Sequence, residues 1–348
     1  MGVSQRRLSP AGSGEESRHL IKSEWAIMSS AVALVAWLTL IPLGFLVWQS
    51  FMTPQTNARP SQFTWGNYLE AYASPETFDL FANSVIFAIG SSLFALVLGT
   101  VLAWMNERTN TPFKSVFYAM SIVPLVVPGI LFVVSWIMLA SPKIGLINLV
   151  LRALLSTDTT FVDCYSLLGM MWVDGLHYAP IAFLLMTAAF RSMDPSLEES
   201  AMMSGASTWK IATRVTLGLA WPAIAASFLI LFVRSIESFE VPALLGTPVG
   251  IQVFTSSIYD AIHRYPSDVG LASAYAILLL LITSGGIWFQ SKIASHGAKY
   301  STVTGKGFRP RLIDLGMWRY FSAACFLLYV LIAVAMPFFI LVWSSLQR

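Results

Sequence analysis

Seven long apolar runs constrain this chain more than any other feature of its sequence. A spanning helix needs about 20 predominantly apolar residues to cross roughly 30 Å of hydrocarbon. Because the runs lack the weak alternation typical of a membrane β-barrel, we expect helices. The sequence predicts an all-α membrane protein with about seven transmembrane helices. The runs are Ala26–Phe51, Leu80–Trp104, Ser115–Ala140, Tyr165–Phe190, Val215–Ile236, Val269–Phe289 and Tyr320–Leu346.

The composition supports a membrane protein and disfavours other classes. Only 11% of the residues are charged and 56% are hydrophobic, whereas an ordinary globular protein has about a quarter charged residues. So little charge cannot cover a water-facing surface, so we expect lipid as the surroundings and no nucleic acid as a partner. The two cysteines, Cys164 and Cys325, form no C-x-x-C motif and no disulfide framework.

The basic residues predict the orientation. If the N-terminus is cytoplasmic, the inner segments hold 15 of the 21 Lys and Arg residues and the outer segments hold 5. This bias favours a cytoplasmic N-terminus, and seven spans then place the C-terminus outside. Residues 1–24 are expected to form a cytoplasmic tail. The first apolar run is too long for the apolar part of a signal peptide, so we expect it to remain as an anchor.

Three outer loops are longer than a simple turn. Two of them contain segments that could form short helices, Asn67–Ala73 and Ile147–Leu155. The third, Val241–Pro266, is rich in Gly and Pro and is predicted to be irregular, either re-entrant or on the surface.

The first and last apolar runs end alike. Pro42–Phe51 and Pro337–Leu346 share P-x-x-x-L-V-W-x-S followed by a large apolar residue. One interpretation is chance similarity between two apolar helices. The other is an internal repeat, as in many transporters. In that case residues 320–348 are the first helix of a second repeat, and the chain is a truncated half of a longer protein.

The polar segment between the fourth and fifth runs, Arg191–Leu217, has the pattern of a short amphipathic helix. Asp194 or Ser196 can cap its start, and Gly205 can end it. The acidic residues Glu198 and Glu199 lie in the predicted first turn, where they favour the helix dipole. A second helical stretch is expected to begin at Ser207 or Thr208 and to continue into the fifth span.

The segment Glu199–Gly205, E-S-A-x-x-x-G, resembles the E-A-A-x-x-x-G loop of ABC importer permeases in sequence and location. The similarity continues through A-S-x-W, residues 206–209, and V-T-L, residues 215–217, with Ser200 and Gly218 as mild departures from the family pattern. It implies the type I ABC importer transmembrane-domain fold for residues 25–292. It also implies that the loop 191–214 is a coupling helix seated on an ATP-binding subunit. The coupling residues that the resemblance implies are Glu198, Glu199, Ala201, Gly205, Ala206 and Trp209.

Two further stretches look like those of fused, double-length permeases. Tyr300–Gly316 resembles their linker, so residues 293–319 are expected to be a cytoplasmic linker, and Ser238–Gly246 looks typical of the same group. Such permeases are associated with ferric iron and with polyamines, thiamine and phosphonates. The resemblance implies ferric iron as the cargo, a bacterial inner-membrane location, and three partners: ATP-binding cassette subunits, a periplasmic solute-binding protein and a second permease half.

No catalytic motif accompanies these features. The chain contains no G-x-x-x-x-G-K-[ST], so ATP hydrolysis is expected on a partner, and it contains no H-E-x-x-H or dense group of metal ligands. The sequence therefore predicts a transport subunit and no enzyme, with no catalytic, cofactor or metal-binding residues.

Three residues with acidic or basic side chains interrupt the apolar runs: Asp174, His177 and Arg234. They could line the solute pathway, or Arg234 could pair with Asp174 or Glu237 and hold two spans together. Glu240, beyond the fifth run, could contact a docking protein. The alternative function is an ion-gradient-driven secondary transporter or channel. It would require charged residues near the bilayer midplane, which five of the runs lack.

Overall fold

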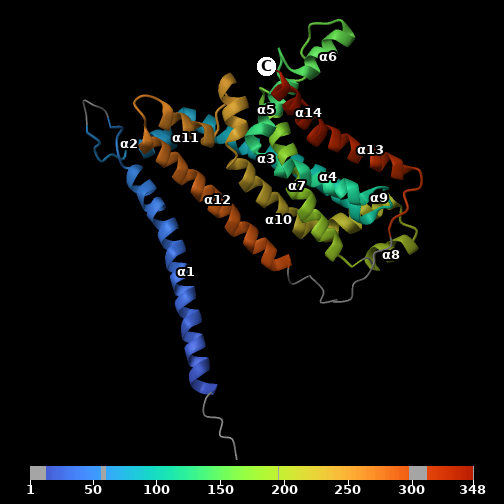
Figure 1. The fold of residues 1–348 in the computed structure, drawn as a ribbon, viewed down its shortest axis with the longest axis horizontal. Coiled ribbons are helices and arrows are strands. Elements are labelled where there is room, and N and C mark those ends of the chain that lie inside the picture. The colour runs from blue at the N-terminus through green and yellow to red at the C-terminus, as the bar shows by residue number, and fades with distance from the viewer. Residues whose placement is uncertain (1–12, 56–59, 195, 298–311, 348) are drawn as a thin grey trace, which may run out of the picture.

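The computed structural model describes residues 13–55, 60–194, 196–297 and 312–347. Figure 1 shows that these residues form a bundle of helices. Six helices are long and apolar enough to cross a membrane, or seven if one bent pair counts as a single span, which confirms the expected number. The predicted linker 293–319 and tail 1–24 lie partly outside the described residues. The long helices are α1 (Ser13–Gln49), α3 (Pro75–Arg108), α7 (Leu167–Ser192), η1–α10 (Ile211–Thr216 and Leu217–Ile236), α12 (Val269–Gly297) and α13–η4–α14 (Trp318–Val330, Leu331–Ala335 and Met336–Leu346).

The third apolar run is broken in the structure, although the sequence predicts one continuous helix over Ser115–Ala140. It forms α4 (Lys114–Val126) and α5 (Gly129–Ala140), which meet at an angle of 99°. Pro128 explains the break, because a proline has no N–H to donate and pushes the preceding residue out of the helical region. Val127 accordingly has an extended backbone, with φ −75° and ψ 126°.

The connecting segments contain short helices. The two predicted ones are confirmed as α2 (Gly66–Ala73) and α6 (Leu146–Leu155). The prediction for Val241–Pro266 is only partly correct. This segment begins with two single turns, η2 (Pro242–Gly246) and η3 (Thr247–Val249), but then forms the regular helix α11 (Phe254–His263). The buried Phe254 explains α11, since its side chain is fully enclosed and its N–H donates to the Ser84 hydroxyl of α3 at 2.9 Å.

Helices α3 and α7 form the centre of the bundle, and α10 packs against both. Small residues allow the close approach, as is common between membrane helices. A Cβ atom added at Gly99 of α3 would lie 2.5 Å from that of Ala182 in α7, and one added at Gly175 of α7 would lie 2.5 Å from the ring of Phe94. The buried core surrounds this contact and includes Phe87, Phe132 and Phe183.

The first and last spans differ in how they pack. The apolar part of α1, Ile27–Gln49, has no buried residues and stands away from the bundle beside α12 (Figure 1). The last span lies against α4 and α5. There the rings of Phe117 and Phe326 stack with centroids 4.9 Å apart, and the Tyr329 hydroxyl donates to the Ser121 carbonyl at 3.2 Å.

Candidate functional site

The polar segment between α7 and α10 folds as predicted into α8 (Ser196–Met203), followed by α9 (Thr208–Lys210). At its start, the Asp194 carboxylate accepts a hydrogen bond from the Ser196 N–H at 2.9 Å. At its end, Gly205 has a φ of +79°, and the Ala206 N–H donates to the Ala201 carbonyl at 3.1 Å. This left-handed helix end is the kind that glycine adopts without steric cost.

Glu198 of α8 points into the protein and forms a buried ion pair. Its side chain lies 3.3 Å from the Arg108 guanidinium of α3 and accepts a hydrogen bond from the Thr216 hydroxyl of η1 at 2.6 Å. Arg108 is itself only 1% exposed. It also donates to the carbonyls of Phe190 and Met193, at the end of α7, at 2.9 Å and 3.4 Å. One guanidinium therefore connects α8 to α3 and α7, and the Glu198 carboxylate extends the connection to η1.

The other predicted coupling residues lie on the outside of this segment. Glu199, Gly205 and Trp209 are exposed, whereas Ala201 and Ala206 are partly buried. Two large apolar side chains of this segment are strongly exposed: Met203 is 91% exposed and Trp209 is 77% exposed. An exposed helix with apolar surface residues, anchored by a buried ion pair, is suited to contact another protein.

A second ion pair lies near the same end of the bundle. Arg191 of α7 binds the Glu107 carboxylate of α3 through two hydrogen bonds of 2.9 Å, and its guanidinium lies over the ring of Tyr118. The Arg191 side chain is 57% exposed, so this pair is a surface contact, unlike the pair between Arg108 and Glu198.

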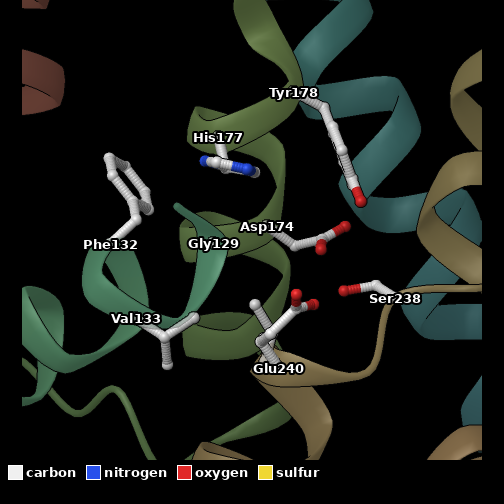
Figure 2. A pocket seen from close by; sticks show the side chains of 9 residues that line it. Gly129, Phe132, Val133, Asp174, His177, Tyr178, Ser238 and Glu240 are labelled. Atoms are coloured by element: carbon white, nitrogen blue, oxygen red, sulfur yellow. The ribbon is translucent and has the colours of Figure 1, made fainter. Parts of the chain in front are cut away.

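A polar pocket lies at the break between α4 and α5, toward the other end of α7. Figure 2 shows Asp174, Tyr178, Ser238 and Glu240 around it. The cavity has a volume of about 80 Å³ and is lined by α7, the start of α5 and the segment between α10 and η2. Asp174 is 1% exposed. One of its carboxylate oxygens and the Nδ1 atom of His177 are buried without a hydrogen-bond partner among the described residues.

The structure brings Asp174 and His177 together in this pocket but leaves Arg234 outside it. Arg234 is exposed, and the ion pairs among the described residues do not join it to Asp174 or Glu237. The predicted pairing that would hold two spans together is therefore not among the ion pairs of the described residues.

Sequence reasoning missed three residues of these sites. Arg108 and Thr216 carry no motif, and their shared partner Glu198 is distant from Arg108 in the chain. For Glu240, the sequence leaves contact with a docking protein as one possibility, and in the structure this residue lines the pocket. The one available signal for Arg108 is that it is the first basic residue after a long uncharged run.

Comparisons with known proteins agree with these features. The family model described as "Binding-protein-dependent transport system inner membrane component" matches residues 91–296, which is more than half of the chain. The ferric transport system permease protein FbpB of Actinobacillus pleuropneumoniae is 28% identical over 238 residues, covering 67% of this chain and 33% of that protein. The sulfate transport system permease protein CysT of Escherichia coli is 23% identical over 273 residues, covering 76% of this chain and 90% of that protein. The chain thus spans about a third of the length of the ferric transport permeases it matches.

Solved structures share the fold. A bacterial ABC transporter involved in the import of the acidic polysaccharide alginate is similar with a TM-score of 0.63 and 19% identity, covering 82% of this chain and 100% of that one. This likeness confirms the type I ABC importer transmembrane-domain fold that the segment Glu199–Gly205 implies. Since the family model covers more than half of its length, this chain belongs to the binding-protein-dependent transport system inner membrane components, the permease family of ABC importers.

Proposed function

We propose that this chain is the membrane-spanning permease part of an ATP-driven importer, and that α8 receives the movement of an ATP-binding subunit. The observation that carries this proposal is the buried ion pair between Arg108 and Glu198, whose Nη1 and Oε2 atoms are 3.3 Å apart. This pair joins an exposed helix to the two central spans. A push on α8 is passed to α3 and α7, because a buried ion pair resists separation. ATP hydrolysis takes place on the partner subunit, which docks on residues 191–214.

The proposal includes a second permease half. The apolar part of α1 has no buried residues, whereas the last span of this chain is packed against α4 and α5. An apolar helix of this length, whose main contact inside the described part of its own chain is α12, has most of its surface available for another subunit or for lipid. In the proposed assembly, α1 packs on the second half, and the N-terminus is cytoplasmic.

The proposed cargo is ferric iron, delivered by a periplasmic solute-binding protein. The match to ferric transport permeases supports this choice, although other relatives of similar likeness are named for sulfate or for galactooligosaccharides. One similar solved transporter is in complex with a periplasmic protein, which supports a partner of that kind.

The first test is purification of the protein from its native membranes, followed by identification of its partners and measurement of ATPase activity. The informative variant is Met203→Asp, which places a charge on the exposed face of α8. Leu154→Asp is the matched control, because Leu154 is a comparably exposed apolar residue on α6, outside the α8 segment.

We expect Met203→Asp to reduce co-purification of the ATP-binding subunit and ATP-dependent uptake of radioactive iron by at least about tenfold, while Leu154→Asp leaves both unchanged. Recovery of the intact protein without any ATPase would favour the ion-gradient-driven transporter. A solute-binding protein that retains sulfate or sugar and no iron would replace the cargo and leave the importer in place.

A further inference from the structure

The pocket at the break between α4 and α5 is lined by residues with polar atoms that find no hydrogen-bond partner in the part of the chain that the structure describes. Asp174 is almost completely enclosed, yet one of its oxygens has no hydrogen bond, and the same is true of Nδ1 of His177. Buried polar groups are almost always paired. Asp174 and His177 both line the cavity, so a group bound there can satisfy polar atoms of their side chains.

The charges in the pocket are unbalanced. Two carboxylates, Asp174 and Glu240, line it, and no ion pair among the described residues includes either one. Arg234, at the end of the neighbouring helix α10, is exposed and does not line the cavity. The hydroxyls of Tyr178 and Ser238 point toward Asp174 in Figure 2. The residues that line the pocket therefore offer oxygen atoms and two carboxylates, and they include no Lys or Arg.

We propose that this pocket binds a hard, oxygen-preferring metal cation on its way through the membrane. Hard cations select carboxylate, hydroxyl and water oxygens over sulfur, and the cavity of about 80 Å³ has room for an ion with water molecules. The direction of passage rests on the proposed function, whereas binding at this site does not.

The pocket is suited to transient binding of an ion rather than to permanent binding. Among the described residues, no three His, Cys, Asp or Glu side chains converge closely enough to hold a metal ion by themselves. An ion that crosses a membrane must bind well enough to enter and weakly enough to leave. The walls come from three separate segments, α7, α5 and the connection from α10 to η2, so a relative movement of these segments opens or closes the site.

The position of the pocket agrees with this role. Asp174 lies 18 residues before Ser192, the last residue of α7, which corresponds to roughly 27 Å along the helix axis. The α8 segment follows that end of α7. The cation site and the α8 segment are therefore separated along one continuous helix, and a movement transmitted through α7 reaches both.

Terbium(III) is a suitable probe, because it is a hard trivalent cation whose luminescence is excited by a nearby aromatic side chain such as Tyr178. The transporter is purified from its native membranes into lipid nanodiscs, and the ion is titrated in. The test variants are Asp174→Asn and Glu240→Gln. The matched control is Glu237→Gln, because Glu237 lies on the same connection but is exposed and does not line the pocket.

We expect saturable terbium luminescence in the unchanged protein. The affinity for terbium should fall at least about tenfold in each test variant and stay unchanged in Glu237→Gln. Thermal unfolding of each variant shows whether it folds. If Asp174→Asn does not, Glu240→Gln alone decides, since Glu240 is only partly buried. Equal terbium affinity in Glu240→Gln and the unchanged protein would show that the pocket is not the binding site. Displacement of terbium by equimolar spermidine would show that the pocket binds a polyamine and not a metal ion.

The failure of this proposal can be told apart from failure of the proposed function. Terbium binding that depends on Glu240 in a protein without an ATPase partner would leave the site standing and refute the importer. The opposite result would refute the site and leave the importer standing. In that case ATP-dependent iron uptake is normal, and neither Glu240→Gln nor Asp174→Asn changes terbium binding or uptake.

Discussion

At the scale of single residues, Arg108 has the most consequential environment. Its guanidinium is buried, forms an ion pair with Glu198 and donates to two carbonyls at the end of α7. Arginine suits this position because its planar group carries several donors and its charge persists at all ordinary pH values. Lysine cannot reproduce this geometry, since it presents a single compact charge.

We predict that Arg108→Ala destabilises the protein by about 3–5 kcal/mol, because it leaves the Glu198 carboxylate buried without its cation. Arg191→Ala is the control. It removes the exposed ion pair with Glu107 and should cost about 0–1 kcal/mol. Thermal or denaturant unfolding in detergent compares the two variants. Similar losses for both would show that the buried pair has no special structural role.

A second prediction at this scale concerns Cys164. This thiol is 2% exposed, and burial raises its pKa to about 11. Since the thiolate is the reactive form, Cys164 should resist alkylation at pH 8 while the protein is folded. Mass spectrometry after iodoacetamide treatment should find Cys164 modified only when the protein is first unfolded in denaturant. Rapid modification of the folded protein would contradict the burial.

At the scale of elements, the end of α8 depends on one backbone conformation. Gly205 has a φ of +79°, and a Cβ atom there would meet no neighbour within 4 Å. Glycine is therefore required for its backbone freedom rather than for lack of space inside this chain.

Gly205→Ala should cost about 1–2 kcal/mol, because a non-glycine residue is strained in the left-handed region. Gly218→Ala provides a control of the same chemistry. Gly218 lies inside α10 with right-handed backbone and open space around its Cβ position, so alanine should stabilise that helix by about 0.5–1 kcal/mol. Unfolding free energies of the two variants should therefore shift in opposite directions, and a shift of both in one direction would refute this explanation.

At the scale of the whole molecule, the two terminal spans end in the same sequence pattern but have opposite surroundings. The last span packs against α4 and α5, while α1 touches little beyond α12. If both are first helices of related halves, each is expected to occupy an equivalent position on the opposite half. The exposed surface of α1 would then be an interface in the assembled transporter.

Photo-cross-linking from α1 tests this arrangement. A photoreactive phenylalanine analogue at Trp37, which is 68% exposed, should form cross-links to a second permease half in native membranes. The same analogue at Phe326, which is fully buried against α4, should react only within this chain. Cross-links from position 37 to lipid alone would argue that α1 faces the bilayer.

Much of the fold was predictable from local sequence. The apolar runs determine the spans because hydrocarbon excludes unpaired backbone groups and charges. Asp194 caps the start of α8, and Gly205 ends it. The break before Pro128 also has a local cause, although hydropathy alone predicts one continuous helix there. These features depend on residues within one or two turns of each other, and so the sequence by itself determined them.

Only the tertiary structure decided which polar groups meet. Arg108 and Glu198 come from different helices, as do Asp174 and Glu240, and no spacing rule relates them. The same holds for Arg234, which is exposed and does not line the pocket in which Asp174 is buried. Side-chain meetings of this kind depend on helix rotation and crossing, which the packing of small residues such as Gly99 and Gly175 sets in three dimensions.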